Sequence, residues 1–285
     1  MTAIITGING QDGFYLKELL ERNKFNVISI SRDSEYNISQ YDDIAACFNK
    51  YKPLFVFHLA ANSTTRHESL FENHQIISTG TLNILEAVKK NSPHTKVFIA
   101  GSGLQFKNVG NPIKETDPFD ARDVYSVSRI HSVYAARYYR SLGIKADVGY
   151  LFNHDSPRRT ERHMAKKISE AAKRIATGQI QTLEIGDISV VKEWTFAEDI
   201  VNGIWAFVNQ DHVYEANISS GIGYSIENWL ELCFGFVGKD WKEYVVLNDN
   251  FKADYKILIS DPSLIFSLGW QPRTSFEQLA KLMMQ

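Results

Sequence analysis

Three residues near the middle of the chain have the types and spacing needed for acid–base chemistry on an oxygen atom. Arg129 follows Tyr125 by four positions, and Ser102 lies upstream at the end of an apolar run. Residues four apart are neighbours on a helix, so a helix here would hold the phenol and the guanidinium on one face. A phenol can donate a proton, a hydroxyl can hydrogen-bond a developing alkoxide, and an arginine supplies a permanent positive charge. The trio predicts proton exchange with a carbonyl or alcohol oxygen.

A glycine-rich segment near the start of the chain predicts a dinucleotide site. The sequence GINGQDG at 7–13 follows an apolar strand directly and opens an amphipathic helix. Glycines in that context allow a tight turn and close approach of the backbone to a pyrophosphate, which the helix N-terminus attracts. The residues expected to form this cradle are Gly7, Ile8, Gly10, Gln11, Asp12 and Gly13.

The residues after the second expected strand indicate which dinucleotide binds. Arg32 suits the 2′-phosphate of NADP(H), whereas an acidic residue would accept a hydrogen bond from the 2′-hydroxyl of NAD(H). Asp33 is the next residue, and a shift of one position at the strand end would place its carboxylate at the ribose. We therefore expect NADP(H), with NAD(H) as the alternative.

The alternation of short apolar runs with amphipathic segments predicts the fold class. Strands are expected near 3–6, 26–30, 54–59 and 96–100, and helices near 15–22, 41–50, 79–90 and 125–141. Strands separated by helical segments form parallel sheets with helices on both faces. We predict an α/β protein with a Rossmann-type doubly wound parallel sheet. Residues 1–152 would mainly bind the dinucleotide, and residues 153–285 would mainly form a smaller substrate-binding region with segments returning to the sheet.

Composition excludes several kinds of partner. The 285-residue chain has a formal net charge of −2, so nothing electrostatic favours nucleic acid or an anionic membrane. No apolar run approaches the ~20 residues that span a bilayer, and no leader peptide is expected before the first strand. Cys47 and Cys233 have no metal-ligand spacing, so we expect free thiols, no metal and a cytoplasmic location.

Longer stretches carry a resemblance that covers nearly the whole chain. They are TGINGQDG at 6–13, HLAANS at 58–63, LFNHDSPRR at 151–159, the segment 186–194 with Asp199, and the segment 261–276. With these stretches the chain resembles the extended short-chain dehydrogenase/reductases, and most closely the GDP-mannose 4,6-dehydratase family. The resemblance implies a nucleotide sugar as substrate, with GDP favoured.

The resemblance also implies roles for individual residues. The cofactor would contact the phosphate cradle described above, Asn37 and Ile38 near the adenine, and Leu59, Ala60, Ala61, Ser63, His154 and Arg159 elsewhere. The sugar nucleotide would contact Asn153, Lys192 and Lys252, of which the two lysines stand where the family has arginines. Tyr125, Ser102 and Arg129 would be catalytic, with serine in place of the family's threonine and arginine in place of its lysine.

Two departures from the family bear on assembly and chemistry. Only residues 33–36 separate Arg32 from Asn37, whereas the family has a longer segment there that helps build a tetramer, so a homodimer through paired helices is expected instead. Leu104 stands where the family has its glutamate, and leucine can neither take nor give a proton. The 4,6-dehydration, which needs a base beside C5, is therefore expected to be crippled unless Gln105 or a distant residue substitutes.

These residues favour hydride transfer at C4 of the sugar without dehydration. The first hypothesis is an NADPH-dependent reductase of a GDP-linked 4-keto-6-deoxy sugar that serves polysaccharide biosynthesis. The second is a 4,6-dehydratase with a base recruited from another segment. The third, motivated by Leu104 and Arg129 occurring together, is a catalytically degenerate nucleotide-binding partner protein. His58, His74 and His163 are expected to be structural or surface residues.

Overall fold

A six-stranded parallel sheet forms the centre of the molecule. The computed structural model describes residues 1–248, 250–251 and 253–285. Every neighbouring pair in the sheet is parallel, which confirms the predicted doubly wound class. In spatial order the strands are β10 (Glu215–Ile218), β5 (Ala146–Leu151), β4 (Lys96–Ser102), β3 (Phe55–His58), β1 (Thr2–Thr6) and β2 (Asn26–Ile30).

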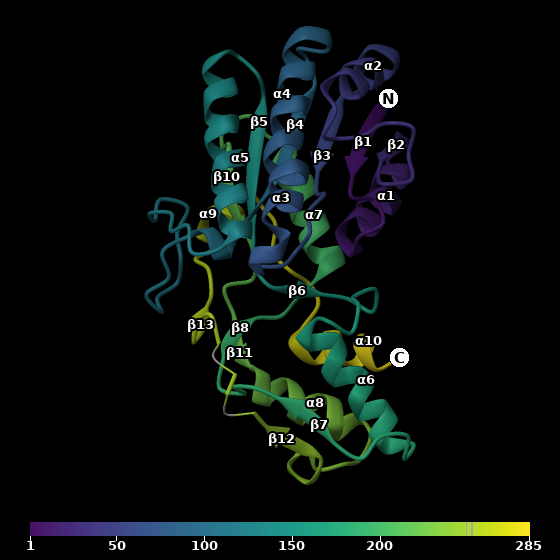
Figure 1. Cartoon of the computed structure of the whole chain (residues 1–285), viewed down its shortest axis with the longest axis vertical. Coiled ribbons are helices and arrows are strands. Elements are labelled where there is room, and N and C mark those ends of the chain that lie inside the picture. Colours follow the sequence, from purple (N-terminus) through teal and green to yellow (C-terminus); the bar gives the residue numbers. More distant parts are fainter. Residues whose placement is uncertain (249, 252) are drawn as a thin grey trace.

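Helices cover both faces of this sheet, as Figure 1 shows. One buried cluster joins the sheet to α2 (Tyr41–Tyr51), α4 (Gly80–Asn91) and α5 (Val124–Ser141). The cluster on the opposite face contains side chains of α1 (Gln11–Arg22), α7 (Ala197–Val208) and α9 (Ser263–Ser267). The short segments η1 (His67–Ser69), α3 (Leu70–Asn73) and η2 (His74–Thr79) lead into α4, and η3 (Gly103–Gln105) follows β4.

The elements expected from the sequence form, with small changes at their ends. Helix α1 begins at Gln11, four residues before the expected start, because it opens directly on the glycine loop. Strand β4 continues to Ser102, which places that hydroxyl at the carboxyl end of the sheet. The apolar residues Val127, Tyr134 and Tyr138 of α5 are 45%, 58% and 61% exposed, so this stripe faces outward rather than into the core.

Beyond Leu151 the chain builds a second layer below the sheet in Figure 1. Its core contains the stacked rings of Trp194 and Trp229, whose centroids are 4.6 Å apart. Strand β10 and helices α7 and α9 return to the main sheet. The remaining elements are β6 (His154–Asp155), α6 (Met164–Ala176), β7 (Leu183–Ile185), β8 (Val191–Glu193), β9 (Thr195–Phe196), β11 (Gly223–Ser225), α8 (Ile226–Phe236), η4 (Trp241–Glu243), β12 (Val245–Leu247), β13 (Ile257–Leu258) and α10 (Phe276–Met284).

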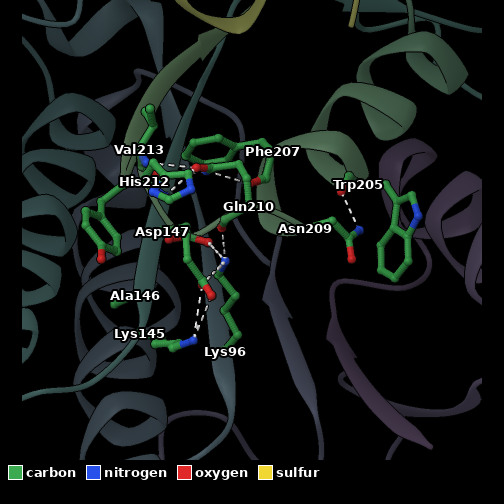
Figure 2. A network of polar contacts seen from close by, with 12 residues as sticks. Lys96, Lys145, Ala146, Asp147, Trp205, Phe207, Asn209, Gln210, His212 and Val213 are labelled. Atoms are coloured by element: carbon green, nitrogen blue, oxygen red, sulfur yellow. Dashed lines mark hydrogen bonds and ion pairs between the residues drawn. The ribbon is translucent and has the colours of Figure 1, made fainter. Parts of the chain in front are cut away.

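A buried ion pair ties β4 to β5 at the amino end of the sheet (Figure 2). Lys96 Nζ lies 3.3 Å from Asp147 Oδ2 and 3.1 Å from Asp211 Oδ1, and it donates to the carbonyl of Gln210. Burial raises the pKa of Asp147 to about 7 against the opposing effect of Lys96. No helix in the described part of the chain is long and apolar enough to cross a bilayer.

Candidate active site

A cavity of about 330 Å³ opens at the carboxyl ends of the parallel strands, where doubly wound sheets bind ligands. It brings together most of the residues singled out from the sequence. Those lining it are Gly7, Gly10, Gln11, Asp12, Gly13, Leu59, Ala61, Ser63, Ser102, Tyr125, Arg129, Asn153, His154 and Arg159.

The glycine loop is shaped to admit a backbone-bound anion. Gly7 has φ +77°, and a Cβ there would lie 2.8 Å from the backbone nitrogen of Ala60. A Cβ at Gly13 would lie 2.4 Å from the carbonyl oxygen of Gly7 and 2.6 Å from Ile8 Cα. Only glycines therefore allow α1 to start this close to β1. The first residues of α1, Gln11, Asp12 and Gly13, line the cavity, and the unpaired N–H groups of a helix start attract an anion. The donor set fits a dinucleotide pyrophosphate.

Buried polar contacts fix this loop against the segment that follows β5. His154 Nε2 lies 2.9 Å from Asp12 Oδ1, and Gln11 donates to the His154 carbonyl while accepting from Ser156 Oγ. Burial opposes ionisation of both partners, but their mutual attraction outweighs it. The pKa of Asp12 falls below its usual range and that of His154 rises above its own. Asp12 and His154 thus form an ion pair that holds the cavity wall.

Helix α5 positions Tyr125 and Arg129, as their spacing predicted. Asp123 caps the helix, since its Oδ1 accepts from the backbone nitrogens of Tyr125 (2.8 Å) and Ser126 (2.9 Å). Ser102 caps η3 in turn: its Oγ accepts from the Leu104 nitrogen at 3.2 Å. Because that bond uses a lone pair, the Ser102 hydroxyl proton stays available for a ligand oxygen in the cavity.

The guanidinium of Arg129 is buried beneath the tyrosine ring. Its Cζ lies 5.0 Å from the Tyr125 ring centroid, and Nη1 donates to the carbonyl of Ala100. Arg129 Nε has no protein partner among the described residues. Burial, with the charge of Arg129, lowers the pKa of His58 to about 3, and Thr6 Oγ1 holds the neutral ring at 2.8 Å. His58 is structural, and Arg129 is the charge next to the phenol.

Leu104 lines both the main cavity and a second one of about 320 Å³, as do Thr65, Gly103 and Leu258. Gln105 does not take over from the missing glutamate: it is fully buried, its Oε1 accepts from the Ser102 nitrogen, and it lines neither cavity. Among the described residues, the one carboxylate that lines the main cavity is Asp12, already paired with His154. The second cavity carries two carboxylates, Asp123 and Asp254.

Positive charge gathers at the side of the cavity near α6. Arg159 and Arg162 carry this charge, and His163, expected from the sequence to be a structural or surface residue, lines the same cavity. Burial, with Arg159, lowers the pKa of His163 to about 4. Thr64 and Thr65 also line the cavity. In the sequence these two threonines, like Arg162 and His163, belong to no motif that marks a ligand site. The signal that could have identified them is their position shortly after the stretches 58–63 and 151–159, which carry the family resemblance.

The other described residues expected at the substrate or cofactor are not part of the lining of this cavity. Lys192 is buried with its Nζ 4.2 Å from the Trp194 ring centroid, and burial lowers its pKa. Ala60 donates its backbone N–H to Thr6 Oγ1, and Ile38 packs against Gly80. The exposed Asn37 accepts from Ser39 through its Oδ1, while Arg32 pairs with Glu72. Lys252 lies outside the described residues.

Comparison with known proteins decides the family. The GDP-mannose 4,6 dehydratase profile matches residues 35–283. The chain belongs to this family. It is 31% identical to GDP-mannose 4,6 dehydratase 2 of Arabidopsis thaliana, over 99% of this chain and 85% of that one. It is therefore a nucleotide-sugar enzyme of the extended short-chain dehydrogenase/reductase type.

Solved structures show the same fold at lower identity. RMD from Pseudomonas aeruginosa, complexed with NADPH, superposes with a TM-score of 0.89 at 20% identity, covering 99% of this chain and 97% of that one. The UDP-glucose 4-epimerase of Thermus thermophilus, in complex with NAD, gives a TM-score of 0.86 at 19% identity, covering 100% and 98%. The family and the fold predicted from the sequence are confirmed.

Proposed function

We propose that this protein is an NADPH-dependent reductase of a nucleotide-activated 4-keto-6-deoxy sugar, with GDP as the favoured nucleotide. The observation that carries the proposal is that Tyr125 and Ser102 line the same cavity as Leu104, which stands where the family has its proton-transferring glutamate. The remaining carboxylate of that cavity, Asp12, is held by His154 among the residues the structure describes. Reduction of a ketone needs an acid and a hydrogen-bond donor, and it needs no base at C5.

The residues of the cavity divide the work at the ketone. When bound, the reduced nicotinamide supplies hydride to the sugar C4. Tyr125 donates its phenolic proton to the C4 oxygen, and Ser102 donates a hydrogen bond to the same oxygen as negative charge develops there. Arg129 stays charged throughout and stabilises the tyrosinate left behind. Because arginine does not deprotonate, the tyrosine regains its proton from water or from ligand hydroxyls.

The cations near α6 suit the diphosphate of a nucleotide sugar. Arg162 offers a planar donor fork to these phosphate oxygens, and Asn153 lines the same cavity. Arg159 is kept as a contact of the cofactor, as the family resemblance implies. Lys192 and Lys252 are proposed substrate contacts, as the family resemblance implies. Gly7, Gly10 and Gly13, with Ile8, Gln11 and Asp12, would hold the cofactor pyrophosphate. NADP(H) is proposed over NAD(H) because Arg32 stands at the end of β2.

An anaerobic assay with NADPH and a GDP-4-keto-6-deoxy sugar tests the reaction. Absorbance loss of NADPH should match the amount of 4-hydroxy product one to one, and omission of the sugar should stop it. GDP-mannose with NADP⁺ should give no 4-keto product. Failure to reduce any 4-keto sugar nucleotide while both ligands bind would contradict the proposal and favour a catalytically degenerate binding protein.

A second candidate, a 4,6-dehydratase with a recruited base, is favoured by one observation. Asp123 and Asp254 line the second cavity, which Leu104 also lines, and relatives over nearly the full length are dehydratases by name. Formation of a 4-keto product from GDP-mannose, without net cofactor consumption, would establish it. Loss of that product in Asp254→Asn but not in Asp120→Asn would identify the base.

We also propose a cytoplasmic homodimer. The outward stripe of Val127, Tyr134 and Tyr138 on α5 supplies the apolar surface that paired helices would bury. We further propose, as the sequence predicts, that residues 1–152 mainly bind the dinucleotide and that residues 153–285 mainly bind the sugar nucleotide. Sedimentation of the wild-type chain and of a Tyr138→Glu variant tests the assembly, which the introduced charge should split.

A further inference from the structure

The end of β2 carries both an arginine and a carboxylate. Arg32 lies two residues beyond the strand, and its side chain is 80% exposed. Its Nη2 lies 2.5 Å from Oε1 of Glu72, a residue of α3 that is 40 positions away in the sequence. The sequence had offered Asp33 as the acidic candidate, but Asp33 is exposed and makes no hydrogen bond or ion pair with the described residues.

Glu72 is also fixed from the cavity side. Its Oε2 accepts from Asn62 Nδ2 at 2.7 Å, and Asn62 lies between the cavity-lining residues Ala61 and Ser63. Asn62 Nδ2 is in addition 3.3 Å from Ser69 Oγ. The carboxylate therefore bridges the loop after β3 and the residue after β2. That is the edge of the sheet at which dinucleotide-binding proteins hold the ribose of the adenosine.

We propose that Glu72 sets the preference between NAD(H) and NADP(H). This inference rests on the proposed function, which requires the chain to bind one of these dinucleotides. The Glu72 carboxylate can accept a hydrogen bond from the 2′-hydroxyl of NAD(H) while it keeps Arg32. A 2′-phosphate must instead draw the guanidinium of Arg32 away from Glu72 and then lie near a like charge. Glu72 thus weakens NADP(H) relative to NAD(H), and Arg32 opposes it.

Dissociation constants for the full-length protein test this role without any turnover. NADPH and NADH are titrated separately against the wild type and Glu72→Gln, with energy transfer from tryptophan to the nicotinamide as the signal. The variant should bind NADPH about fivefold more tightly, because a repulsion worth roughly that factor is removed. NADH binding should stay the same or weaken. The gain for NADPH should shrink at high salt, which screens an exposed charge.

Two further variants keep the result interpretable. Glu68→Gln changes an exposed glutamate four residues away that makes no described contact, and it should leave both constants unchanged. Arg32→Ala combined with Glu72→Gln should lose the gain for NADPH. Equal shifts for both dinucleotides in Glu72→Gln, or no shift, would overturn the proposal. A chain that binds dinucleotides with the expected shift but reduces no sugar would remove the proposed reaction and leave the role of Glu72 standing.

Discussion

At the scale of single residues, the chemistry depends on one phenol and on one leucine. In the proposed reaction Tyr125 and Ser102, which both line the cavity, supply the donors to the ketone, and Leu104 stands where the family resemblance implies a proton-transfer group. The guanidinium of Arg129 lies against the face of the Tyr125 ring and donates to the carbonyl of Ala100, so its positive charge is held beside the phenol. The proposed reaction therefore moves one proton at one oxygen and removes no hydrogen from a neighbouring carbon.

Replacing Tyr125 by phenylalanine should lower kcat by about 10²- to 10⁴-fold, the usual value of general acid help. The dissociation constant of NADPH should change little, because the ring that covers Arg129 is kept. Single-turnover reduction measured beside a binding titration checks both. Tyr134→Phe is the matched control, since Tyr134 lies on the same helix and is exposed. An active Tyr125→Phe enzyme would remove the phenol from the mechanism.

The sequence anticipated the neighbourhood of these residues better than their contacts. Spacing alone placed Tyr125 and Arg129 on one helix face, and the strand before Ser102 placed its hydroxyl at the sheet edge. The bond from Arg129 to Ala100 was not predictable, because it joins residues 29 positions apart through a rotamer set by packing. Glu72 was missed for the same reason, because a half-buried glutamate in a short helix belongs to no readable pattern.

At the scale of elements, α5 is the part that aligns the site. Its N-cap residue Asp123 holds the backbone nitrogen of Tyr125 itself, so the cap fixes the first turn on which the phenol is carried. The capping box with Ser126 completes this end of the helix. Stability of the helix start and position of the catalytic side chain are therefore coupled.

Asp123→Ala should lower the free energy of unfolding by about 1 kcal/mol, the typical value of an N-cap. It should also lower kcat more than it changes KM, because the phenol loses its fixed backbone. Denaturant unfolding and steady-state kinetics measure the two effects, and Asp123→Asn should restore most of both. Asp120→Ala, which loses only a contact to the exposed Arg122, is the control. Unchanged stability in Asp123→Ala would contradict the role of the cap.

Element prediction succeeded where the pattern was long. Strands β1 and β4 are nearly continuous buried runs, as parallel strands inside a sheet are, whereas the edge strand β2 is only partly buried. The small sheets of the second layer were not predicted, because strands of two or three residues, such as β6, β7 and β13, are too short to show a hydrophobic periodicity. The residues they position, including Lys192, could be placed only through the family resemblance.

At the scale of the whole molecule, the two ends of the sheet have different tasks. Ligands are expected at the carboxyl end, while the amino end holds the buried pair of Lys96 and Asp147 seen in Figure 2. The pKa of Asp147 is raised to about 7 in the folded protein from an ordinary value near 3.8. The folded state therefore binds this proton more tightly than the unfolded state does.

The sign of this shift fixes a pH dependence of stability. The stabilising contribution of the protonated carboxyl is complete below about pH 4 and is lost as the pH rises through 7. From pH 5 to pH 8, Asp147→Asn should gain about 2–3 kcal/mol of unfolding free energy relative to the wild type. Urea unfolding at several pH values measures this difference. Asp211→Asn, at the exposed carboxylate of the same network, should show no such trend, and a flat difference for Asp147→Asn would contradict the assignment.

The most direct test of the central claim follows hydrogen at C4 and C5 of the sugar. The enzyme is incubated in heavy water with a GDP-4-keto-6-deoxy sugar and NADPH carrying ordinary hydrogen, and the product is examined by NMR. Reduction without proton transfer at carbon predicts a protium at C4 from the cofactor and no deuterium at C5 beyond that of an enzyme-free control, because Leu104 supplies no base. Deuterium at C5 above the level of that control would show that a group of the enzyme transfers protons at this carbon, and would contradict the proposal.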